Sequence, residues 1–89
     1  MEGIKMIVKT AYTEDLQSRI RYDLIREYRE LNEIYYIGYG FEVTSCESGE
    51  SRRIADFTSL SRRAEKVFQL LVDCKVAPLQ LQYVLEDLL

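Results

Sequence analysis

Residues 35–43, Tyr-Tyr-Ile-Gly-Tyr-Gly-Phe-Glu-Val, repeat with a period of two. The odd positions are all aromatic or aliphatic, whereas the even positions carry Tyr36, Gly38, Gly40 and Glu42. A period of two with aromatic and β-branched residues predicts a strand with one apolar face. Because a lone hairpin is only marginally stable in water, such a strand needs paired neighbours. The chain must therefore build a sheet around this segment.

The residues that follow supply one neighbour. Residues 47–51, Glu-Ser-Gly-Glu-Ser, predict a hairpin turn in which Gly49 is available for a positive φ angle, and residues 52–57 predict a short return strand. Gly38 and Gly40 lie on one face of the central strand, where the lack of side chains lets another element approach the backbone closely. We expect that element to be a helix.

The opening segment of the chain also alternates. Residues 4–11 predict a first strand, whose faces are expected to carry Ile4, Met6 and Val8 on one side and Lys5, Ile7 and Lys9 on the other. The second face therefore mixes charged and apolar side chains, which indicates that it is partly in contact with water.

Residues 13–34 fit two patterns, and periodicity alone slightly favours a helix. In the helical alternative Thr13 is the N-cap, and apolar residues recur at spacings of three and four: Leu16, Ile20, Leu24, Tyr28, Leu31 and Tyr35. In the strand alternative residues 31–33 form a turn, and one face carries Ile20, Tyr22, Leu24, Arg26 and Tyr28. The pattern leaves both alternatives open.

After Thr58 the pattern becomes helical. Ser59 or Ser61 can cap a helix over residues 60–74, whose apolar stripe consists of Leu60, Ala64, Val67, Phe68 and Leu71. Pro78 suits the first turn of a second helix over residues 78–88, whose stripe consists of Leu81, Val84, Leu85 and Leu88. The strands are therefore expected first and the helices last.

Three segments carry a resemblance to a known family: Arg-Tyr-Asp-Leu-Ile at residues 21–25, Tyr-Gly-Phe at residues 39–41, and the C-terminal segment that begins at Pro78. Across nearly its whole length the chain resembles a family of short uncharacterised proteins from anaerobic Gram-positive bacteria, a domain of unknown function. Where such relatives have a histidine, this chain has Gln80, so no role of an imidazole carries over. The resemblance implies a strand at residues 21–30 and implies no activity.

Together these patterns predict an α+β fold, a four-stranded antiparallel β-meander followed by two C-terminal α-helices packed on one face of the sheet. A chain of 89 residues with 47% hydrophobic and 30% charged residues is expected to form a single domain over residues 1–89 with one core. The strands are expected at residues 4–11, 19–30, 35–46 and 52–57, and the helices at 60–74 and 78–88.

Composition argues against several functions. A net charge of −3 disfavours non-specific binding to nucleic acid or anionic lipid, and the chain has no histidine to act as a general base or metal ligand. Cys46 and Cys74 form no CxxC motif and are expected to be buried or half-buried thiols of a cytoplasmic protein. No segment is expected to span a membrane or to act as a signal peptide. We therefore expect no enzyme, and no cofactor, metal, nucleic-acid or membrane partner.

Two arginine pairs form one candidate site. The tripeptide Ser-Arg-Arg occurs twice, so that Arg52, Arg53, Arg62 and Arg63 are candidates for binding an anion beside the start of the first predicted helix. The more ordinary interpretation is a solvated basic face whose ion pairs contribute little to stability.

Three further residues are candidates for contact with a partner, two carboxylates near the C-terminus and one aromatic ring of the central strand. Glu86 and Asp87 lie near the end of the second predicted helix, where negative charge opposes the helix dipole. They are expected to contact either an arginine of this chain or a basic partner. Tyr36, beside the two glycines, is the ring most expected at an interface.

These features favour a small non-catalytic interaction module that binds a protein partner or a second copy of itself. Its main support is the second sheet face, where Ile7, Ile25, Leu31 and Tyr36 would otherwise contact water. The alternative is a sensor domain that binds an anion or a small ligand through the four arginines.

Overall fold

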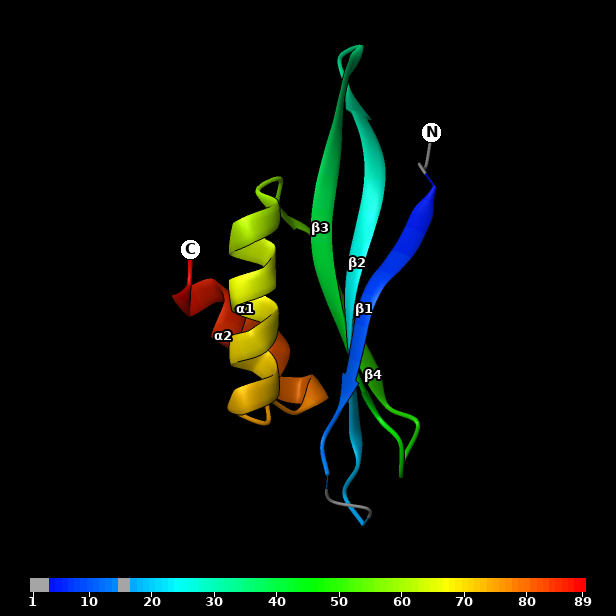
Figure 1. Cartoon of the computed structure of the whole chain (residues 1–89), viewed down its shortest axis with the longest axis vertical. Helices are drawn as coiled ribbons and strands as arrows, with labels where there is room; N and C mark the ends of the chain where they lie inside the picture. Colours follow the sequence, from blue (N-terminus) through cyan, green and yellow to red (C-terminus); the bar gives the residue numbers. More distant parts are fainter. Residues whose placement is uncertain (1–3, 15–16) are drawn as a thin grey trace.

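The computed structural model describes residues 4–14 and 17–89 (Figure 1). The strands are β1 (Lys5–Tyr12), β2 (Ile20–Leu31), β3 (Ile34–Ser45) and β4 (Ser51–Thr58), and the helices are α1 (Ser61–Asp73), a short 3-10 turn η1 (Pro78–Gln80) and α2 (Leu81–Asp87). The four strands are antiparallel and lie in the order β1-β2-β3-β4, with both helices on one face (Figure 1). The expected α+β meander is confirmed. The bounds of the four strands and of α1 lie within one residue of the expected ones, whereas the helix expected over residues 78–88 is the turn η1 followed by α2, which begins three residues later than expected.

Residues 20–31 form a strand, not the helix that periodicity slightly favoured. Thr13, the N-cap of the helical alternative, instead closes the β1–β2 connection. Its N–H donates to the Ile20 carbonyl oxygen at 3.0 Å, and its hydroxyl accepts from the Ile20 N–H at 2.9 Å. Leu16 of the helical alternative lies outside the described residues. A spacing of four is also a multiple of two, so Leu24 and Tyr28 fitted either pattern.

The β2–β3 connection is a two-residue turn. Asn32 and Glu33 both have positive φ angles, of 50° and 66°, as a type I′ turn requires. This turn type matches the right-handed twist of the flanking strands, so β2 and β3 pair without interruption from Ile20 opposite Ser45 to Leu31 opposite Ile34. The result is a long hairpin of two 12-residue strands.

Strand β1 contains a bulge that corrects the expected distribution of its side chains. Ile7 lies opposite Ile25, but Lys9 lies opposite Leu24, so the alternation shifts between them. Lys9 is therefore on the helix side of the sheet with Met6, and not on the opposite face as predicted. Its Nζ is 5.8 Å from the centre of the Phe68 ring.

The two glycines of β3 face β4, and not a helix as predicted. Tyr39 pairs with Thr58 and Phe41 pairs with Ile54, so residues 55–57 bulge opposite the single residue Gly40. A Cβ at Gly40 would overlap the Ile54 carbonyl oxygen and would lie 2.8 Å from the Ala55 Cα. Glycine is therefore required there by the close approach of β4.

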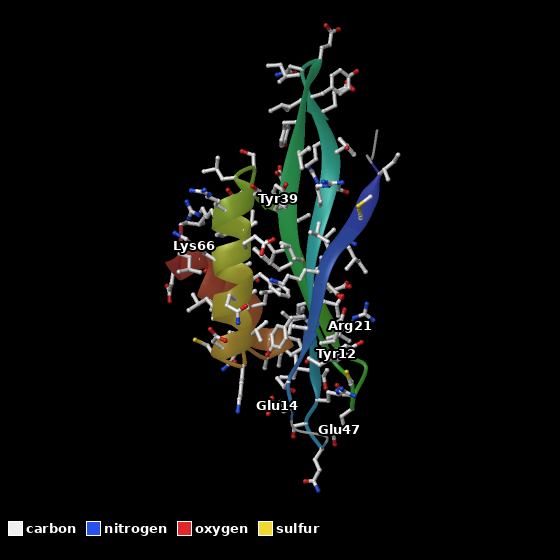
Figure 2. All side chains as sticks on the ribbon, viewed as in Figure 1. Tyr12, Glu14, Arg21, Tyr39, Glu47 and Lys66 are labelled. Carbon is white, nitrogen blue, oxygen red and sulfur yellow. The ribbon has the colours of Figure 1, made fainter. Side chains whose placement is uncertain are left out.

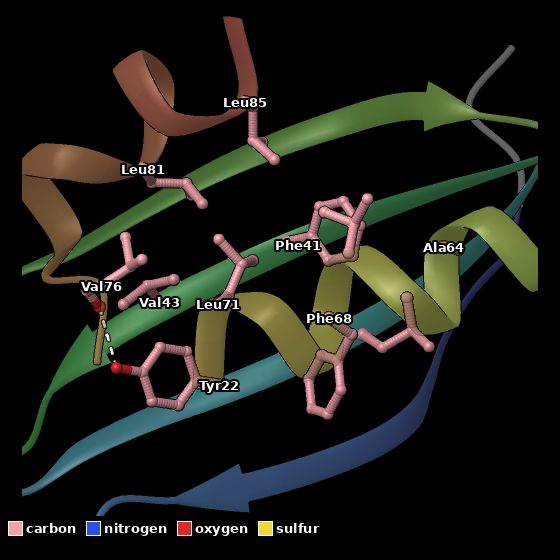
Figure 3. Packing of buried hydrophobic residues seen from close by; sticks show 11 residues of the cluster. Tyr22, Phe41, Val43, Ala64, Phe68, Leu71, Val76, Leu81 and Leu85 are labelled. Atoms are coloured by element: carbon pink, nitrogen blue, oxygen red, sulfur yellow. Dashed lines mark hydrogen bonds between the residues drawn. The ribbon is translucent and has the colours of Figure 1, made fainter. Parts of the chain in front are cut away.

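The core lies between the sheet and the two helices (Figure 3). It contains Tyr22, Leu24, Phe41 and Val43 from the sheet, Ala64, Val67, Phe68 and Leu71 from α1, and Val76, Leu81 and Leu85 from the following segments. Helix α1 is followed, after its C-cap Cys74, by a left-handed residue, Lys75, with a φ angle of 51°. The N–H groups of Lys75 and Val76 donate to the carbonyl oxygens of Val72 and Leu71, each at 3.1 Å, which is the Schellman pattern.

Candidate interaction surface

The helix layer is much shorter than the sheet that it covers. Strands β2 and β3 have 12 residues each and should be about 40 Å long, whereas the 13 residues of α1 extend only about 20 Å. Thr58 pairs with Tyr39, and α1 begins soon afterwards at Ser61. Figure 2 shows Tyr39 level with the start of α1, with the β2–β3 hairpin continuing beyond it. The far end of the sheet is therefore uncovered.

Apolar side chains gather on the helix side of this uncovered end. Met6 and Tyr28 are about half exposed, at 49% and 52%, and Ile4 and Tyr35 are more exposed, at 74% and 76%. The register places Tyr28 opposite the half-buried Ile37, on the same face as the core residues. We call this surface the shelf and define it as Ile4, Met6, Tyr28, Tyr35 and Ile37.

The opposite face of the hairpin tip is apolar as well. Leu31 and Ile34 lie opposite each other and are 63% and 68% exposed. Among the residues expected to be wet on this face, Ile7 and Leu31 are exposed, while Ile25 and Tyr36 are half-buried. Exposed apolar residues that lie together on one part of a small protein mark a binding surface more often than scattered ones do.

The open face of the sheet also carries an internal charge network near Gly38. Arg29 hydrogen-bonds to the buried Glu27 carboxylate, and its Nε lies 3.3 Å from Asp56 Oδ2. Hydrogen bonds raise the pKa of Arg29, and the one to Tyr36 contributes more than the one to Glu27. Lys5 lies 3.9 Å from the second Glu27 oxygen. Both carboxylates are thus neutralised by cations of the same sheet, which explains how charged groups are accommodated on a strand.

Tyr36, the predicted interface ring, belongs to this network. Its hydroxyl donates to Asp56 Oδ2 at 2.8 Å, and the residue is half-buried. Asp56 reaches this position because its φ angle of 55° turns the β4 bulge towards Gly38. The exposed rings at the uncovered end of the sheet are instead Tyr28 and Tyr35. The sequence pattern had placed both of them on the apolar face of the sheet.

The four arginines of the predicted anion site do not converge. Arg52 pairs with Val43 and Arg53 with Glu42, so the two arginines point to opposite faces of the sheet. Arg63 donates to the Leu88 carbonyl oxygen at 2.6 Å, and its guanidinium carbon lies 5.4 Å from the centre of the Phe57 ring. Arg62 lines a shallow hollow at the first turn of α1 together with Leu60, Ser61, Arg63 and Lys66.

Glu86 and Asp87 are exposed at the end of α2. Glu86 accepts a hydrogen bond from Gln82 Nε2 at 3.1 Å. Over the described ranges 4–14 and 17–89, neither carboxylate forms the predicted ion pair with an arginine of the chain. Arg63 of the predicted cluster donates to the backbone of Leu88 instead, and both acids are exposed to solvent.

Neither cysteine is buried as predicted: Cys46 and Cys74 are both exposed free thiols. Cys46 follows the end of β3, and Cys74 is the C-cap of α1. Within the described part of the chain, no three potential metal-ligating side chains lie together. The described helices also include none that is long and apolar enough to cross a membrane.

An open antiparallel sheet with two C-terminal helices on one face and an uncovered apolar end defines a small α+β protein. A family model described as "Family of unknown function (DUF6514)" matches residues 1–89, and the chain belongs to that family. The expected membership of a family of unknown function is confirmed. No curated protein and no solved structure gives a significant match to the chain.

Proposed function

We propose that this chain is a small non-catalytic module of the bacterial cytoplasm that presents the uncovered end of its sheet to a protein partner. The observation that carries the proposal is the shelf, where Tyr28, Tyr35 and Ile4 are exposed beyond the end of the helix layer. Tyrosine is enriched at protein interfaces because its ring is large and rigid and its hydroxyl can remain hydrated.

The composition and the charges support a binding role more than a catalytic one. The buried carboxylate Glu27 is neutralised by Arg29, and Asp23, also buried, is neutralised by Arg21. Both carboxylates therefore form ion pairs within the sheet. Glu86 and Asp87, exposed and without an ion pair among the described residues, add a second surface for a basic partner.

The decisive experiment is affinity capture of partners from native lysate with matched tyrosine variants. Tyr35→Ser changes the shelf, and Tyr83→Ser changes a similarly exposed tyrosine on α2, at 76% and 69% exposure. We expect Tyr35→Ser to lose the captured proteins and Tyr83→Ser to retain them. Equal capture by both variants would refute the shelf as the binding surface. The double variant Glu86→Gln, Asp87→Asn tests the acidic surface in the same assay.

The alternative, an anion-binding domain, has weaker support because Arg52 and Arg53 point away from each other. What favours it is the first turn of α1, which has no acidic residue and whose hollow includes Arg62, Arg63 and Lys66. Millimolar phosphate should then raise the melting temperature of the wild type but not of Arg62→Ala, since a ligand stabilises the state that binds it. An equal response of both proteins would exclude this site.

A further inference from the structure

We propose that the occupant of the shelf is a second copy of this chain, packed face to face about a two-fold axis. This inference rests on the proposed function, because it names the partner of the same surface. The axis would run across the strands at the level of the Tyr28–Ile37 pair. Strand β2 of one copy then lies over β2 of the other copy in the opposite direction.

The height of the helix layer fits this arrangement. Two packed sheets are about 10 Å apart, and a helix is about 10–12 Å across. The hairpin of the second copy would therefore lie in the layer that α1 occupies, above the uncovered end of the sheet and with its tip against the first turn of α1. Each hairpin tip would run towards the start of α1 in the other copy. An isologous contact of this kind closes as a dimer.

The spacing along the strands is also self-complementary. The hairpin turn at Glu33 is about four residues, or about 13 Å, beyond Ile37. In the other direction Tyr39 is two residues from Ile37, and Tyr39 pairs with Thr58 just before α1 begins at Ser61. A half-turn about the proposed axis therefore carries the tip of one copy about two residues past the level of Tyr39, alongside the first turn of α1 in the other copy.

Unpaired charges of opposite sign lie at these two places. Glu33 is exposed at the tip, and Arg62 and Lys66 are exposed at the start of α1. None of the three forms an ion pair with any residue in the ranges that the structure describes. Helix α1 also has no acidic residue in its first turn and no side-chain cap. Glu33 of the second copy would supply the missing negative charge, favoured by both the arginine and the helix dipole.

A second pair of charges is placed symmetrically about the same axis. Arg26 and Glu30 lie on the shelf side of β2, each two residues from Tyr28. The half-turn therefore sets Arg26 of each copy over Glu30 of the other. The Nε of Arg26 is buried without a hydrogen-bond partner among the described residues, and its Nη2 donates to Sδ of Met6, a weak acceptor, at 3.4 Å. A carboxylate from a second copy would give the terminal nitrogens of this guanidinium an acceptor of opposite charge.

The test uses a charge swap between exposed residues, Glu33→Lys and Arg62→Glu. In either variant alone, both charge contacts of the dimer become repulsive. In an equimolar mixture, Lys at position 33 of one chain meets Glu at position 62 of the other, and the second contact keeps its native Arg62 and Glu33. The control is Glu47→Lys, the same charge change in the exposed β3–β4 loop at the other end of the sheet.

Sedimentation velocity from about 1 µM to about 1 mM should show the wild-type mass rising towards twice that of one chain, a range suited to a small, reversible interface. We expect Glu33→Lys and Arg62→Glu each to weaken dimerisation at least about tenfold, the mixture to restore it, and Glu47→Lys to match the wild type.

A wild type that stays monomeric would overturn the self-association inference, as would a mixture that does not recover or a Glu47→Lys variant that is weakened equally. A monomer whose capture of other proteins depends on Tyr35 would overturn only this inference and would leave the proposed function standing. If Tyr35→Ser changed neither capture nor mass, both would fail.

Discussion

The hydroxyl of Tyr22, on β2, donates a buried hydrogen bond of 2.9 Å to the carbonyl oxygen of Val76, in the segment between α1 and α2 (Figure 3). Tyr22 and Val76 are only 1% and 4% exposed. The bond therefore satisfies two polar groups inside the apolar core and fixes the end of α1 to the centre of the sheet. It joins residues that are 54 positions apart in the sequence.

Replacing Tyr22 by Phe should destabilise the fold while preserving its shape. The Val76 carbonyl would lose its side-chain partner in a buried position, which costs about 1–3 kcal/mol in the free energy of unfolding. Urea denaturation at pH 7 measures the change. Tyr83→Phe, at an exposed tyrosine of α2, is the control and should alter the stability by less than about 0.5 kcal/mol. Equal stability of Tyr22→Phe and wild type would show that the bond contributes nothing.

The same tyrosine should make stability depend on pH above pH 10. Burial raises the pKa of Tyr22 from its ordinary value of 10.0 to about 12. Between these values the unfolded chain has released the proton and the folded chain still holds it, so the free energy of unfolding falls as the pH rises. The contribution is fully present below pH 10, and its loss is on the order of 2 kcal/mol by pH 12.

Urea denaturation of wild type and Tyr22→Phe at pH 9 and pH 11.5 isolates this effect, because the other six of the seven tyrosines are common to both proteins. The stability gap between the two proteins should narrow at the higher pH. A gap that is independent of pH would mean that Tyr22 titrates normally in the folded chain.

Replacing Gly40 by Ala should be more damaging than replacing Gly38 by Ala. A Cβ at Gly40 meets the backbone of β4 at Ile54 and Ala55, which cannot move without disturbing the bulge. Overpacking of this kind costs about 1–3 kcal/mol or more. A Cβ at Gly38 meets the side chains of Asp56 and Arg29, which can rotate away. The melting temperatures of the two variants, measured by thermal denaturation, rank their stabilities. A higher melting temperature for Gly40→Ala than for Gly38→Ala would contradict this packing.

The element boundaries were predictable because two of the periodicities are unambiguous. Within β3, residues 35–43 carry an aromatic or aliphatic residue at every odd position, and the stripe of α1 fits only a period of 3.6. Strand β2 was different, because Ile20, Leu24 and Tyr28 are spaced by four and fit a helix and a strand equally. Tyr22, which is fully buried between them, fits only the strand.

The bulges were not predictable from the pattern. A bulge inserts one extra residue into a strand and so shifts the alternation, as between Ile7 and Lys9. The sequence pattern does not indicate where this happens. The partner of Gly40 depends on how β4 returns across the sheet, which is a tertiary contact. For the shelf a usable signal existed: two 12-residue strands are about twice as long as the 13-residue helix beside them.

Replacing Lys75 by Gly should stabilise the protein. Lys75 has a φ angle of 51° at the C-terminus of α1, a conformation that costs a residue with a Cβ about 1–2 kcal/mol and costs glycine nothing comparable. Glycine also loses more backbone entropy on folding, so a net gain of about 0.5–1 kcal/mol is expected. Lys66→Gly is the matched control. It lies inside α1 and should lose about 1 kcal/mol. The urea concentration at the midpoint of unfolding should therefore rise for Lys75→Gly and fall for Lys66→Gly. A fall for both variants would show that the left-handed residue carries no strain.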